Sequence, residues 1–585
     1  MALNHHGQIA ASWLLDFGNF LAASDVQRTS ACFQPNGFLR DVLVFTWKNR
    51  TLRGIEKIVA YLGDAFARGV SVSQFQIDER PGLSPSVGPT LSTSCASAIS
   101  SGFLFSTAIG VGRGYFTLVP GDVDVSEWKA VTVLMTLWEI YGHEEQGAEE
   151  GTYGGHTIAW EDVDAERRSQ VEHDPYALII GGGQTGLNVA ARFRQMQIPA
   201  LVIEQYPRIG DNWRKRYPTL SLHTPKTHHT MLYHPYPDNW PTFTSRDKLA
   251  NWLEQYAVSQ DLCVWTNSHP LPMPTYDFKS GRWSVTILRH GKSVMLHPAH
   301  IVLAAGTIGT PLIPSLPGRD IFRGPILHSA HYQGGKPFAG KNIVVVGAGN
   351  SAADICQDLV VQGAGAVTMI QRSSTCVVAC SSIRQVAERI WPEGSSIAVA
   401  DFKWMATPFR LLKEVLSEKK EELRAQEKKL HETLTGAGLE LNMGKDGSGQ
   451  FPMFFERFGG YWLDVGCTEL IGSGQVKIKH GVEIEKLTVD SVIFEDGSML
   501  QADAIVFATG YESIRDTMRG LFGDAVMDQT GPVWGVDEEG EIRGCYHASG
   551  HPGLWFAGGN FVTSRFYSKQ LALQIKATEL GFMKR

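Results

Sequence analysis

The chain has 585 residues, 43% of them hydrophobic, and a formal net charge of -7 at pH 7. One hydrophobic core does not grow to this length, so we expect about two to four domains. The negative charge argues against nucleic acid as the main partner. No run of 18 apolar residues and no basic-then-apolar leader occurs, which predicts a soluble, cytoplasmic protein without a membrane span.

Residues 1–141 predict a first domain of mixed helix and strand. Amphipathic periodicity predicts helices at 9–23 and 55–66. Strand-like patterns occupy the stretches 33–47, 103–110, 114–119 and 128–141. This order, with helices first and a curled antiparallel sheet later, resembles the α+β cone fold of nuclear transport factor 2 and of polyketide cyclases. The run 38–47 looks like the version of that domain found ahead of some flavoproteins.

Two adjacent charged residues, Arg40 and Asp41, interrupt the apolar run at 38–47. They could form an acid–base pair in a cavity, as in the cyclases, and the domain would then be a cyclase or isomerase. The alternative is a structural ion pair that supports a docking domain. We favour the structural interpretation, because most charged pairs have no catalytic role.

Residues 142–174 predict a linker after this domain. The first part, 142–155, is acidic and rich in glycine, and it is too polar to build a core. From residue 175 onward, strand and helix signals alternate, which predicts a parallel α/β architecture.

The first chemical motif follows an apolar strand at 176–180 and contains Gly181, Gly183 and Gly186. This G-x-G-x-x-G pattern is typical of a dinucleotide site, because the glycines allow a tight turn, close approach to a pyrophosphate and close helix packing. The next strand ends in Glu204, followed by Gln205, at roughly the spacing expected for a group that contacts the ribose of an adenosine. An acid there repels a 2′-phosphate, so this loop suits FAD or NAD.

A second loop of the same type follows the strand at 342–346. Its residues are Gly347, Gly349, Asn350, Ser351 and Ala352. The strand after it runs into Arg372 and Ser373, and a guanidinium beside hydroxyl groups can hold a 2′-phosphate. The contrast predicts FAD at the first loop and NADPH at the second.

A charged stretch at 411–434 interrupts the second unit, with Leu416, Leu423 and Leu430 at seven-residue spacing. We interpret it as an inserted surface helix that covers the active site, with a coiled-coil partner site as the alternative. Trp240, Trp252 and the aromatic run 451–455 could line a substrate cavity or pack in the core.

Neither the cysteines nor the histidines predict a metal site or a disulfide framework. The eight cysteines include no CxxC pair, and Cys376 and Cys380 are read as ordinary cysteines. Histidines crowd residues 223–234, but no Asp or Glu accompanies them at ligand spacing.

Several motifs resemble the class B flavin monooxygenases. Residues 322–332 fit F-x-G-x-x-x-H-x-x-x-Y, the fingerprint of the flavin-containing and N-hydroxylating members. The other matching segments are 210–213 with Asn212 and Trp213, 503–511 with Thr509 and Gly510, and 553–560 with Gly559 and Asn560. They resemble the G-G-x-W stretch beside the flavin, the D-x-x-x-x-A-T-G-Y strand, and the last FAD-contacting strand and turn of the family.

The resemblance implies two Rossmann-like, three-layer dinucleotide-binding domains behind the α+β cone. The FAD-binding domain would comprise 175–325 and 500–585, and the NADPH-binding domain 326–499 with a helical insertion at about 384–450. In the family, NADPH reduces FAD, oxygen adds at flavin C4a, and retained NADP⁺ shields the hydroperoxide. His328 of the fingerprint is expected to position NADP⁺ rather than to act as a base.

Two departures from the family bear on the reaction. Tyr332 stands where Baeyer–Villiger members end their fingerprint with tryptophan, so it follows the heteroatom-oxidising and plant YUCCA pattern. Residues 221–226 place Pro225 where mammalian-type members have asparagine, closer to the YUCCA L-H-x-P-K stretch. His223 and Lys226 are therefore the candidates for steadying the hydroperoxide.

The leading hypothesis is an NADPH-dependent FAD monooxygenase that uses O2 to oxidise a small lipophilic amine, sulfide or indole-like metabolite, in specialised metabolism. The alternatives are Baeyer–Villiger or oxidative-decarboxylation chemistry on a ketone or 2-oxo acid, and an NADPH–flavin dehydrogenase or oxidase that transfers no oxygen. A homodimer is left open.

Overall fold

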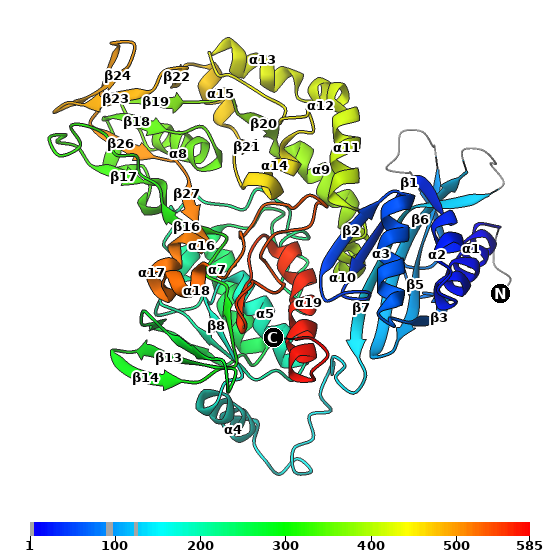
Figure 1. The fold of residues 1–585 in the computed structure, drawn as a ribbon. Helices are drawn as coiled ribbons and strands as arrows, with labels where there is room; N and C mark the ends of the chain where they lie inside the picture. The colour runs from blue at the N-terminus through cyan, green and yellow to red at the C-terminus, as the bar shows by residue number, and fades with distance from the viewer. Residues whose placement is uncertain (1–4, 89–96, 122–126, 585) are drawn as a thin grey trace.

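Three large sheets organise the chain, of which the computed structural model describes residues 5–88, 97–121 and 127–584 (Figure 1). The fold is mixed α/β. Within these described residues, no helix combines the length and the apolar character needed to cross a membrane.

The first sheet has seven strands in the order β2-β1-β7-β6-β5-β3, with β4 paired to β5. Its strands are β1 (Phe33–Val42), β2 (Asn49–Arg53), β3 (Val72–Ile77), β4 (Ser86–Gly88), β5 (Ala98–Thr107), β6 (Gly110–Pro120) and β7 (Trp128–Ile140). Three helices cover one face: α1 (His5–Ala22), α2 (Val26–Ala31) and α3 (Ile55–Ala67). The predicted helices at 9–23 and 55–66 are thus confirmed.

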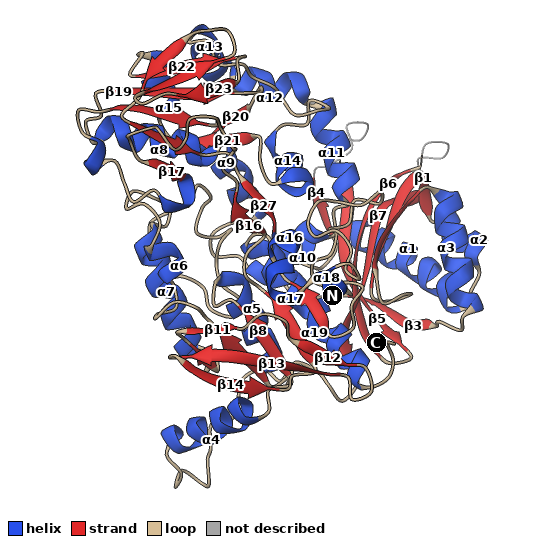
Figure 2. Ribbon diagram, turned by 60° about the vertical axis from the view of Figure 1, so that its left-hand side comes forward, coloured by secondary structure: helices blue, strands red, loops and turns tan. Residues whose placement is uncertain are grey.

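Aromatic side chains fill the space between these helices and the sheet. Trp13 stacks on Phe17 at 4.8 Å between ring centroids, and Phe103 and Phe116 are fully buried beside them. The opposite face of the sheet joins the core of the following region through Val42, Leu134 and other apolar side chains. The sheet therefore lies between α1–α3 and the rest of the chain, as Figure 2 shows.

The segment predicted as a linker, 142–174, contains helix α4 (Trp160–His173), which corrects the prediction for its second half. No residue of α4 is buried. Arg168 forms an ion pair with Asp164, four residues earlier on α4. Arg167 forms one with Glu149 in the preceding loop. Such ion pairs stabilise a polar helix. Because the helix has no apolar face, the periodicity of apolar residues does not predict it.

The second sheet has five parallel strands in the order β10-β9-β8-β15-β28. Its strands are β8 (Ala177–Ile180), β9 (Ala200–Ile203), β10 (Val264–Trp265), β15 (His300–Leu303) and β28 (Leu554–Phe556). Helix α5 (Gln184–Gln195) packs on it, and helix α7 (Arg246–Ser259) packs against α5. The long C-terminal helix α19 (Phe561–Glu579) lies between this region and β7. An antiparallel sheet is appended: β11 (Ser268–Pro270), β12 (Thr275–Asp277), β13 (Arg282–Arg289) and β14 (Lys292–Leu296).

The third sheet repeats the parallel five-stranded plan in the order β17-β26-β18-β19-β22. Its strands are β17 (Ile326–His328), β18 (Asn342–Val346), β19 (Ala366–Gln371), β22 (Val476–His480) and β26 (Ala504–Phe507). Helices α8 (Asn350–Val361) and α15 (Cys467–Gly472) pack against it. A small antiparallel sheet adjoins it: β23 (Ile484–Leu487), β24 (Ser491–Phe494) and β25 (Met499–Gln501).

Strand β26 corrects the predicted domain boundary at residue 500. The prediction assigns 500–585 to the FAD-binding unit, but β26 pairs in parallel with β17 and β18 of the third sheet. Apolar strand composition is the same in both sheets, so the sequence pattern does not tell which sheet a strand joins. The chain returns to the second sheet only at β28.

The insertion after β19 consists of several short helices around a two-stranded parallel pair, β20 (Cys376–Ala379) and β21 (Tyr461–Asp464). The helices are α9 (Cys380–Ile390), α10 (Ile397–Met405), α11 (Phe409–Glu418), α12 (Lys420–Gln426), α13 (Lys428–Gly436) and α14 (Gln450–Arg457). The single helix predicted at 411–434 is wrong in extent, because breaks at Lys419 and Glu427 divide it. Cys376 lies in β20 and Cys380 begins α9, so the two do not share a helix face.

Candidate cofactor and active site

Each glycine loop leaves the carboxyl end of the middle strand of a five-stranded sheet. Gly181 follows β8 with φ +113° and Gly347 follows β18 with φ +127°. A Cβ at Gly181 would lie 2.6 Å from the Ala304 carbonyl oxygen, and one at Gly347 would lie 2.4 Å from that of Ala508. Both positions therefore require glycine, for the backbone angle and for the close approach of the neighbouring strand end.

The other loop positions test whether a dinucleotide fits. A Cβ at Gly186 would lie 2.0 Å from the Gly181 carbonyl oxygen, so α5 packs closely on its strand. In contrast, among the described residues the nearest atom to a Cβ would be 3.4 Å away at Gly183 and 3.8 Å away at Gly349. These middle glycines leave open room beside each loop, as a pyrophosphate needs.

Helices α5 and α8 begin directly after the loops, at Gln184 and Asn350. Their N-cap residues, Gly183 and Gly349, provide no side-chain cap. Because the first N–H groups of a helix have no partner within the helix, these two helix starts offer donors and positive dipole ends to an anion. Asn350 also fixes the insertion, since its Oδ1 accepts a hydrogen bond from Leu463 N at 2.9 Å.

Glu204 lies at the end of β9 beside the first loop. Its carboxylate accepts hydrogen bonds from the N–H groups of Gly182 and Tyr206, both at 2.9 Å. Burial raises the pKa of Glu204, and these hydrogen bonds oppose the rise. The neighbouring Gln205 is exposed.

Arg372 and Ser373 lie just past the end of β19, beside the second loop, and both are exposed. Within residues 5–88, 97–121 and 127–584, Arg372 makes no hydrogen bond or ion pair to the protein. The adjacent Ser374 accepts a hydrogen bond from Asn442 Nδ2 at 3.0 Å. The guanidinium is thus available to a ligand, unlike a salt-bridged surface arginine.

Asn212 and Trp213 lie on the short helix α6 (Asp211–Arg214), opposite the first loop. Asn212 Nδ2 is the atom nearest to the open side of Gly183, at the 3.4 Å given above. The indole N–H of Trp213 is buried and has no hydrogen-bond partner in the part of the chain that the structure describes. A buried donor without a partner is unfavourable, so this group also fits a bound ligand beside the loop.

His328 ends β17 and is fully buried. Its Nδ1 accepts a hydrogen bond from Ala330 N at 3.1 Å, so Nε2 carries the proton and donates to the Gly510 carbonyl oxygen at 3.0 Å. Burial lowers the pKa of His328, and the Gly510 carbonyl opposes that effect. Both ring nitrogens of the neutral imidazole are occupied, and its ring lies edge-on to Tyr511.

His223 and Lys226 lie on the loop after α6 and make different contacts. His223 Nε2 is 3.5 Å from Asp354 Oδ1 of α8, and Tyr217 donates to the other oxygen of that carboxylate at 2.5 Å. Burial raises the pKa of Asp354, and His223 and Tyr217 oppose the rise. Lys226 Nζ donates to Asp238 O at 2.6 Å and pairs with Glu393 at 2.8 Å.

The predicted segments 503–511 and 553–560 contain strands of different sheets, β26 and β28. Thr509 and Gly510 follow β26, and their hydroxyl and carbonyl groups bond to the backbone of Leu312. Gly559 follows β28, and its N–H donates to Thr307 Oγ1 at 2.6 Å. Asn560 caps α19 by accepting from Thr563 N and Oγ1 at 2.9 and 2.8 Å.

The histidine-rich stretch 223–234 packs without forming a metal cluster. No group of three or more His, Cys, Asp or Glu side chains suited to a metal occurs among the residues described here. Burial lowers the pKa of His228 and of His229 to about 3. Trp240 and Trp252 stack with Tyr236 and His234 in an aromatic cluster.

Arg40 and Asp41 do not form an ion pair with one another, which corrects the predicted pair. They are consecutive on β1, so their side chains point to opposite faces of the sheet. Asp41 accepts hydrogen bonds from three backbone N–H groups and from Tyr61 at 2.5 Å, on the helix-covered side. Burial raises the pKa of Asp41 to about 7, and these hydrogen bonds oppose the rise. Arg40 points to the other side and pairs with Glu541.

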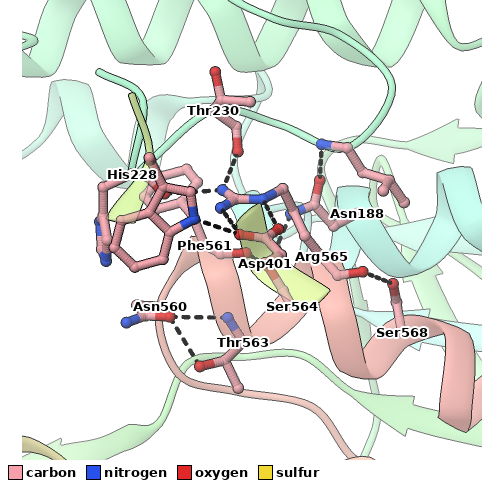
Figure 3. A network of polar contacts seen from close by, with 12 residues as sticks. Asn188, His228, Thr230, Asp401, Asn560, Phe561, Thr563, Ser564, Arg565 and Ser568 are labelled. Carbon is pink, nitrogen blue, oxygen red and sulfur yellow. Dashed lines mark hydrogen bonds and ion pairs between the residues drawn. The ribbon is translucent and has the colours of Figure 1, made fainter. Parts of the chain in front are cut away.

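One buried network was not predicted from the sequence (Figure 3). Arg565 of α19 binds Asp401 of α10 with two hydrogen bonds of 2.7 and 2.8 Å. The same guanidinium donates to the carbonyl oxygens of His228 and Thr230, at 2.9 and 2.7 Å. It thereby joins the insertion, the histidine-rich loop and the helix that begins at the Gly559 turn. The ion-pair partners are 164 positions apart, and no sequence motif marks them.

Comparisons with known proteins agree with this arrangement. Residues 211–515, just over half of the chain, match the family described as flavin-binding monooxygenase-like. The chain is 30% identical over 350 residues to indole-3-pyruvate monooxygenase YUCCA1 of Oryza sativa subsp. japonica, covering 58% of this chain and 77% of the relative. It is 31% identical over 343 residues to probable indole-3-pyruvate monooxygenase YUCCA7 of Arabidopsis thaliana, covering 57% and 74%.

Among solved structures, the closed crystal structure of cyclohexanone monooxygenase aligns with a TM-score of 0.50 and 18% identity. The alignment covers 69% of this chain and 84% of that one, and at this identity it shows similarity of fold alone. The family match begins after the first glycine loop and includes the second. The chain therefore belongs to the flavin-binding monooxygenase-like family and is an oxidoreductase.

Proposed function

We propose that the protein is an NADPH-dependent FAD monooxygenase that oxygenates a small lipophilic nucleophile at nitrogen, sulfur or an indole-like carbon. One observation carries the proposal: two matched parallel sheets present the same glycine loop, followed by an acid in one and an exposed arginine in the other. In this proposal, the second and third sheets are Rossmann-like units for FAD and NADPH. The first sheet with α1–α3 is a cone domain of the nuclear transport factor 2 type.

The two ribose-side groups support the assignment of the cofactors. Glu204 is held beside the first loop by Gly182 N, and its remaining lone pairs can accept ribose hydroxyls while repelling a 2′-phosphate. Arg372 is exposed beside the second loop, where two of its N–H groups can bind a 2′-phosphate. Bound FAD would supply the oxygen-transfer chemistry and NADPH the hydride.

The cradle for the flavin would combine Asn212 and Trp213 with the turn at Gly559 and Asn560. The unpartnered indole N–H of Trp213 supplies a hydrogen bond inside a buried region. The start of α19 at Phe561 directs the positive end of a long helix to the same turn. These groups orient a ligand and exclude water from it.

His328 is a positioning residue in this proposal. Its neutral ring bonds to Ala330 and Gly510, so it holds the Thr509–Gly510 turn beside the second loop. It has no free nitrogen for proton transfer. Lys226 similarly bonds to the backbone at Asp238 and to Glu393. His223, with Asp354 behind it, is the group best placed to hold a proton near the cofactors.

A second candidate function is oxidative decarboxylation of a 2-oxo acid that bears an aromatic side chain. The relatives named indole-3-pyruvate monooxygenases favour it, as does the L-H-x-P-K-like stretch at 222–226. Products distinguish the two candidates. Loss of carbon dioxide from a 2-oxo acid supports the second, whereas an N-oxide or S-oxide with the carbon skeleton intact supports the first.

The decisive experiment uses the purified flavoprotein without substrate. The flavin is reduced anaerobically with NADPH, oxygen is admitted, and absorbance is followed by stopped flow. A transient species distinct from oxidised and reduced flavin supports a monooxygenase. Immediate return to oxidised flavin with stoichiometric hydrogen peroxide would show an oxidase and refute the proposal.

A further inference from the structure

A hairpin at residues 532–544 connects the N-terminal sheet with the turn at Gly559. Its two arms pair through Val536 and Ile542, and Trp534 N donates to Arg543 O at 2.9 Å. Asp537 closes the tip by accepting from the N–H groups of Glu539 and Glu541, both at 2.9 Å. We call this segment the 532–544 hairpin.

Trp534, at the base of the hairpin, lies against the turn that is proposed to contact the flavin. Its ring comes within 2.8 Å of the place where a Cβ on Gly559 would lie. Its indole N–H donates to the Phe454 carbonyl oxygen of α14 at 3.1 Å. The backbone of Trp534 has φ +69°, which is uncommon for a bulky residue and indicates that the surrounding contacts hold it in place.

Three phenylalanines of the insertion surround the Trp534 ring. Phe454 and Phe458 meet it edge-on at 5.5 and 5.4 Å, and Phe455 lies parallel to it at 6.4 Å. None of the four is fully buried, and Phe458 is 36% exposed. Aromatic rings left partly open beside a cofactor turn form a surface that suits a planar apolar ring. We call these four residues the aromatic wall.

The tip of the same hairpin is bound by the N-terminal sheet. Glu541 accepts from Arg40 Nε and Nη2 at 2.7 and 2.8 Å and from Thr51 Oγ1 at 2.6 Å. Glu539 accepts from Arg50 Nε and Nη2 at 2.8 and 2.7 Å. Arg40 also donates to Tyr567 of α19 at 2.6 Å, so the contact reaches the helix that starts at the Gly559 turn.

We propose that Trp534 is a specificity-determining residue and that the N-terminal domain positions it through Arg40–Glu541 and Arg50–Glu539. The substrate class this site selects is a planar aromatic compound whose ring packs on the aromatic wall. This inference rests on the proposed function, because it takes the Gly559 turn to be the flavin turn. It gives the N-terminal domain a positioning role in place of a reaction of its own.

The first test compares binding of indole with binding of cyclohexanol to the FAD-loaded protein by calorimetry. In Trp534→Leu, the Kd for indole should rise about fivefold or more, because an aromatic contact is lost, while that for cyclohexanol changes less than about twofold. Trp534→Phe, which keeps a ring, should restore indole binding to within about twofold. The exposed Trp160 of α4 provides the control, as Trp160→Leu should change neither value.

The second test examines the positioning role. Glu539→Gln and Glu541→Gln should each weaken the binding of indole but not that of cyclohexanol. Adding either substitution to Trp534→Leu should weaken indole binding little further, because both act through the Trp534 side chain. Glu414→Gln is the matched control, since Glu414 pairs with Arg53 of the same strand β2 at 2.6 Å but lies on α11, outside the hairpin. Glu539 is partly exposed, so its variant tests the proposal even if Glu541→Gln folds poorly.

The outcomes separate this inference from the proposed function. The specificity role is overturned if NADPH reduces the flavin normally but Trp534→Leu weakens the binding of indole and of cyclohexanol equally. It is also overturned if the substitution weakens the binding of neither compound. If Glu414→Gln has the same effect as Glu539→Gln, the positioning role of the hairpin contacts is overturned. Absence of NADPH-driven flavin reduction in the unmodified protein would instead refute the proposed function.

Discussion

Arg40 and Glu541 form a buried bidentate ion pair between residues 501 positions apart, with side chains 7% and 5% exposed. Burial opposes ionisation of the glutamate, but the Arg40 guanidinium outweighs it and holds the pKa of Glu541 below its usual range. The pair joins the N-terminal sheet to the 532–544 hairpin. The N-terminal sheet is therefore docked through specific buried charges as well as through apolar surface.

Removing one partner of this pair should destabilise the protein. Arg40→Met leaves the Glu541 carboxylate buried without its counter-charge, which costs about 3–5 kcal/mol. The double variant Arg40→Met/Glu541→Leu should recover most of the loss, because no buried charge remains. Thermal unfolding followed by circular dichroism measures both.

The more exposed pair Arg53–Glu414 provides the comparison for this prediction. Arg53→Met should cost less than about 1 kcal/mol, as exposed pairs do. Equal losses in Arg40→Met and Arg53→Met would show that burial of the Arg40 pair does not determine its energy.

Gly347→Ala should impair use of NADPH. The new Cβ would lie 2.4 Å from the Ala508 carbonyl oxygen at φ +127°, so the loop must shift. If this strain of about 1–3 kcal/mol makes the binding free energy of NADPH less favourable by the same amount, the KM for NADPH rises roughly five- to 150-fold. Stopped-flow flavin reduction at varied NADPH gives the value, and FAD content should be unchanged because the Gly181 loop belongs to another sheet.

Gly436→Ala is the control for the glycine substitution. Gly436 ends α13, and a Cβ there would meet no atom of the described residues within 4 Å. It should leave flavin reduction unaltered, and an equal defect in both variants would mean that the Gly347 loop has no special role.

Arg372→Ala should discriminate between the two nicotinamide cofactors. Loss of a charged hydrogen-bonding group should raise the KM for NADPH about tenfold or more, while that for NADH, which lacks the 2′-phosphate, stays within about twofold. Steady-state oxidation of each cofactor measures this. Arg384→Ala removes an arginine of α9 that is already paired with Glu388 and should affect neither. Equal increases for NADPH and NADH would exclude the assigned role of Arg372.

Acid should destabilise the fold through His229. Burial lowers its folded pKa to about 3, below the unfolded value, so the unfolded chain binds the extra proton between these values. The contribution of His229 is complete above about pH 6.5 and is lost as the pH falls, by about 2 kcal/mol between pH 6.5 and 5. Urea unfolding at pH 7 and pH 5 measures it.

His229→Gln should reduce that difference by about 2 kcal/mol, because glutamine does not titrate in this range. His173→Gln, at the exposed end of α4, should leave it unchanged. A pH dependence that persists in full in His229→Gln would assign the effect to other groups.

The sequence determined the local features of this protein. Periodicity was sufficient for helices 9–23 and 55–66, since one apolar stripe must face a core in any fold. The glycine loops were recognisable because a strand, a turn with positive φ and a helix are consecutive in the chain. The resemblance to the flavin monooxygenases rests on such contiguous motifs, and the family is confirmed.

Only the tertiary structure decided which distant segments meet. It placed β26 in the third sheet, directed Arg40 to Glu541 rather than to Asp41, and brought Trp534 to the turn at Gly559. The local sequence of an apolar strand or of a single charged residue does not predict its partner, because pairing depends on the path of the chain between them. The position of a side chain relative to a neighbour hundreds of residues away is a property of packing, and packing is settled only when the whole chain has folded.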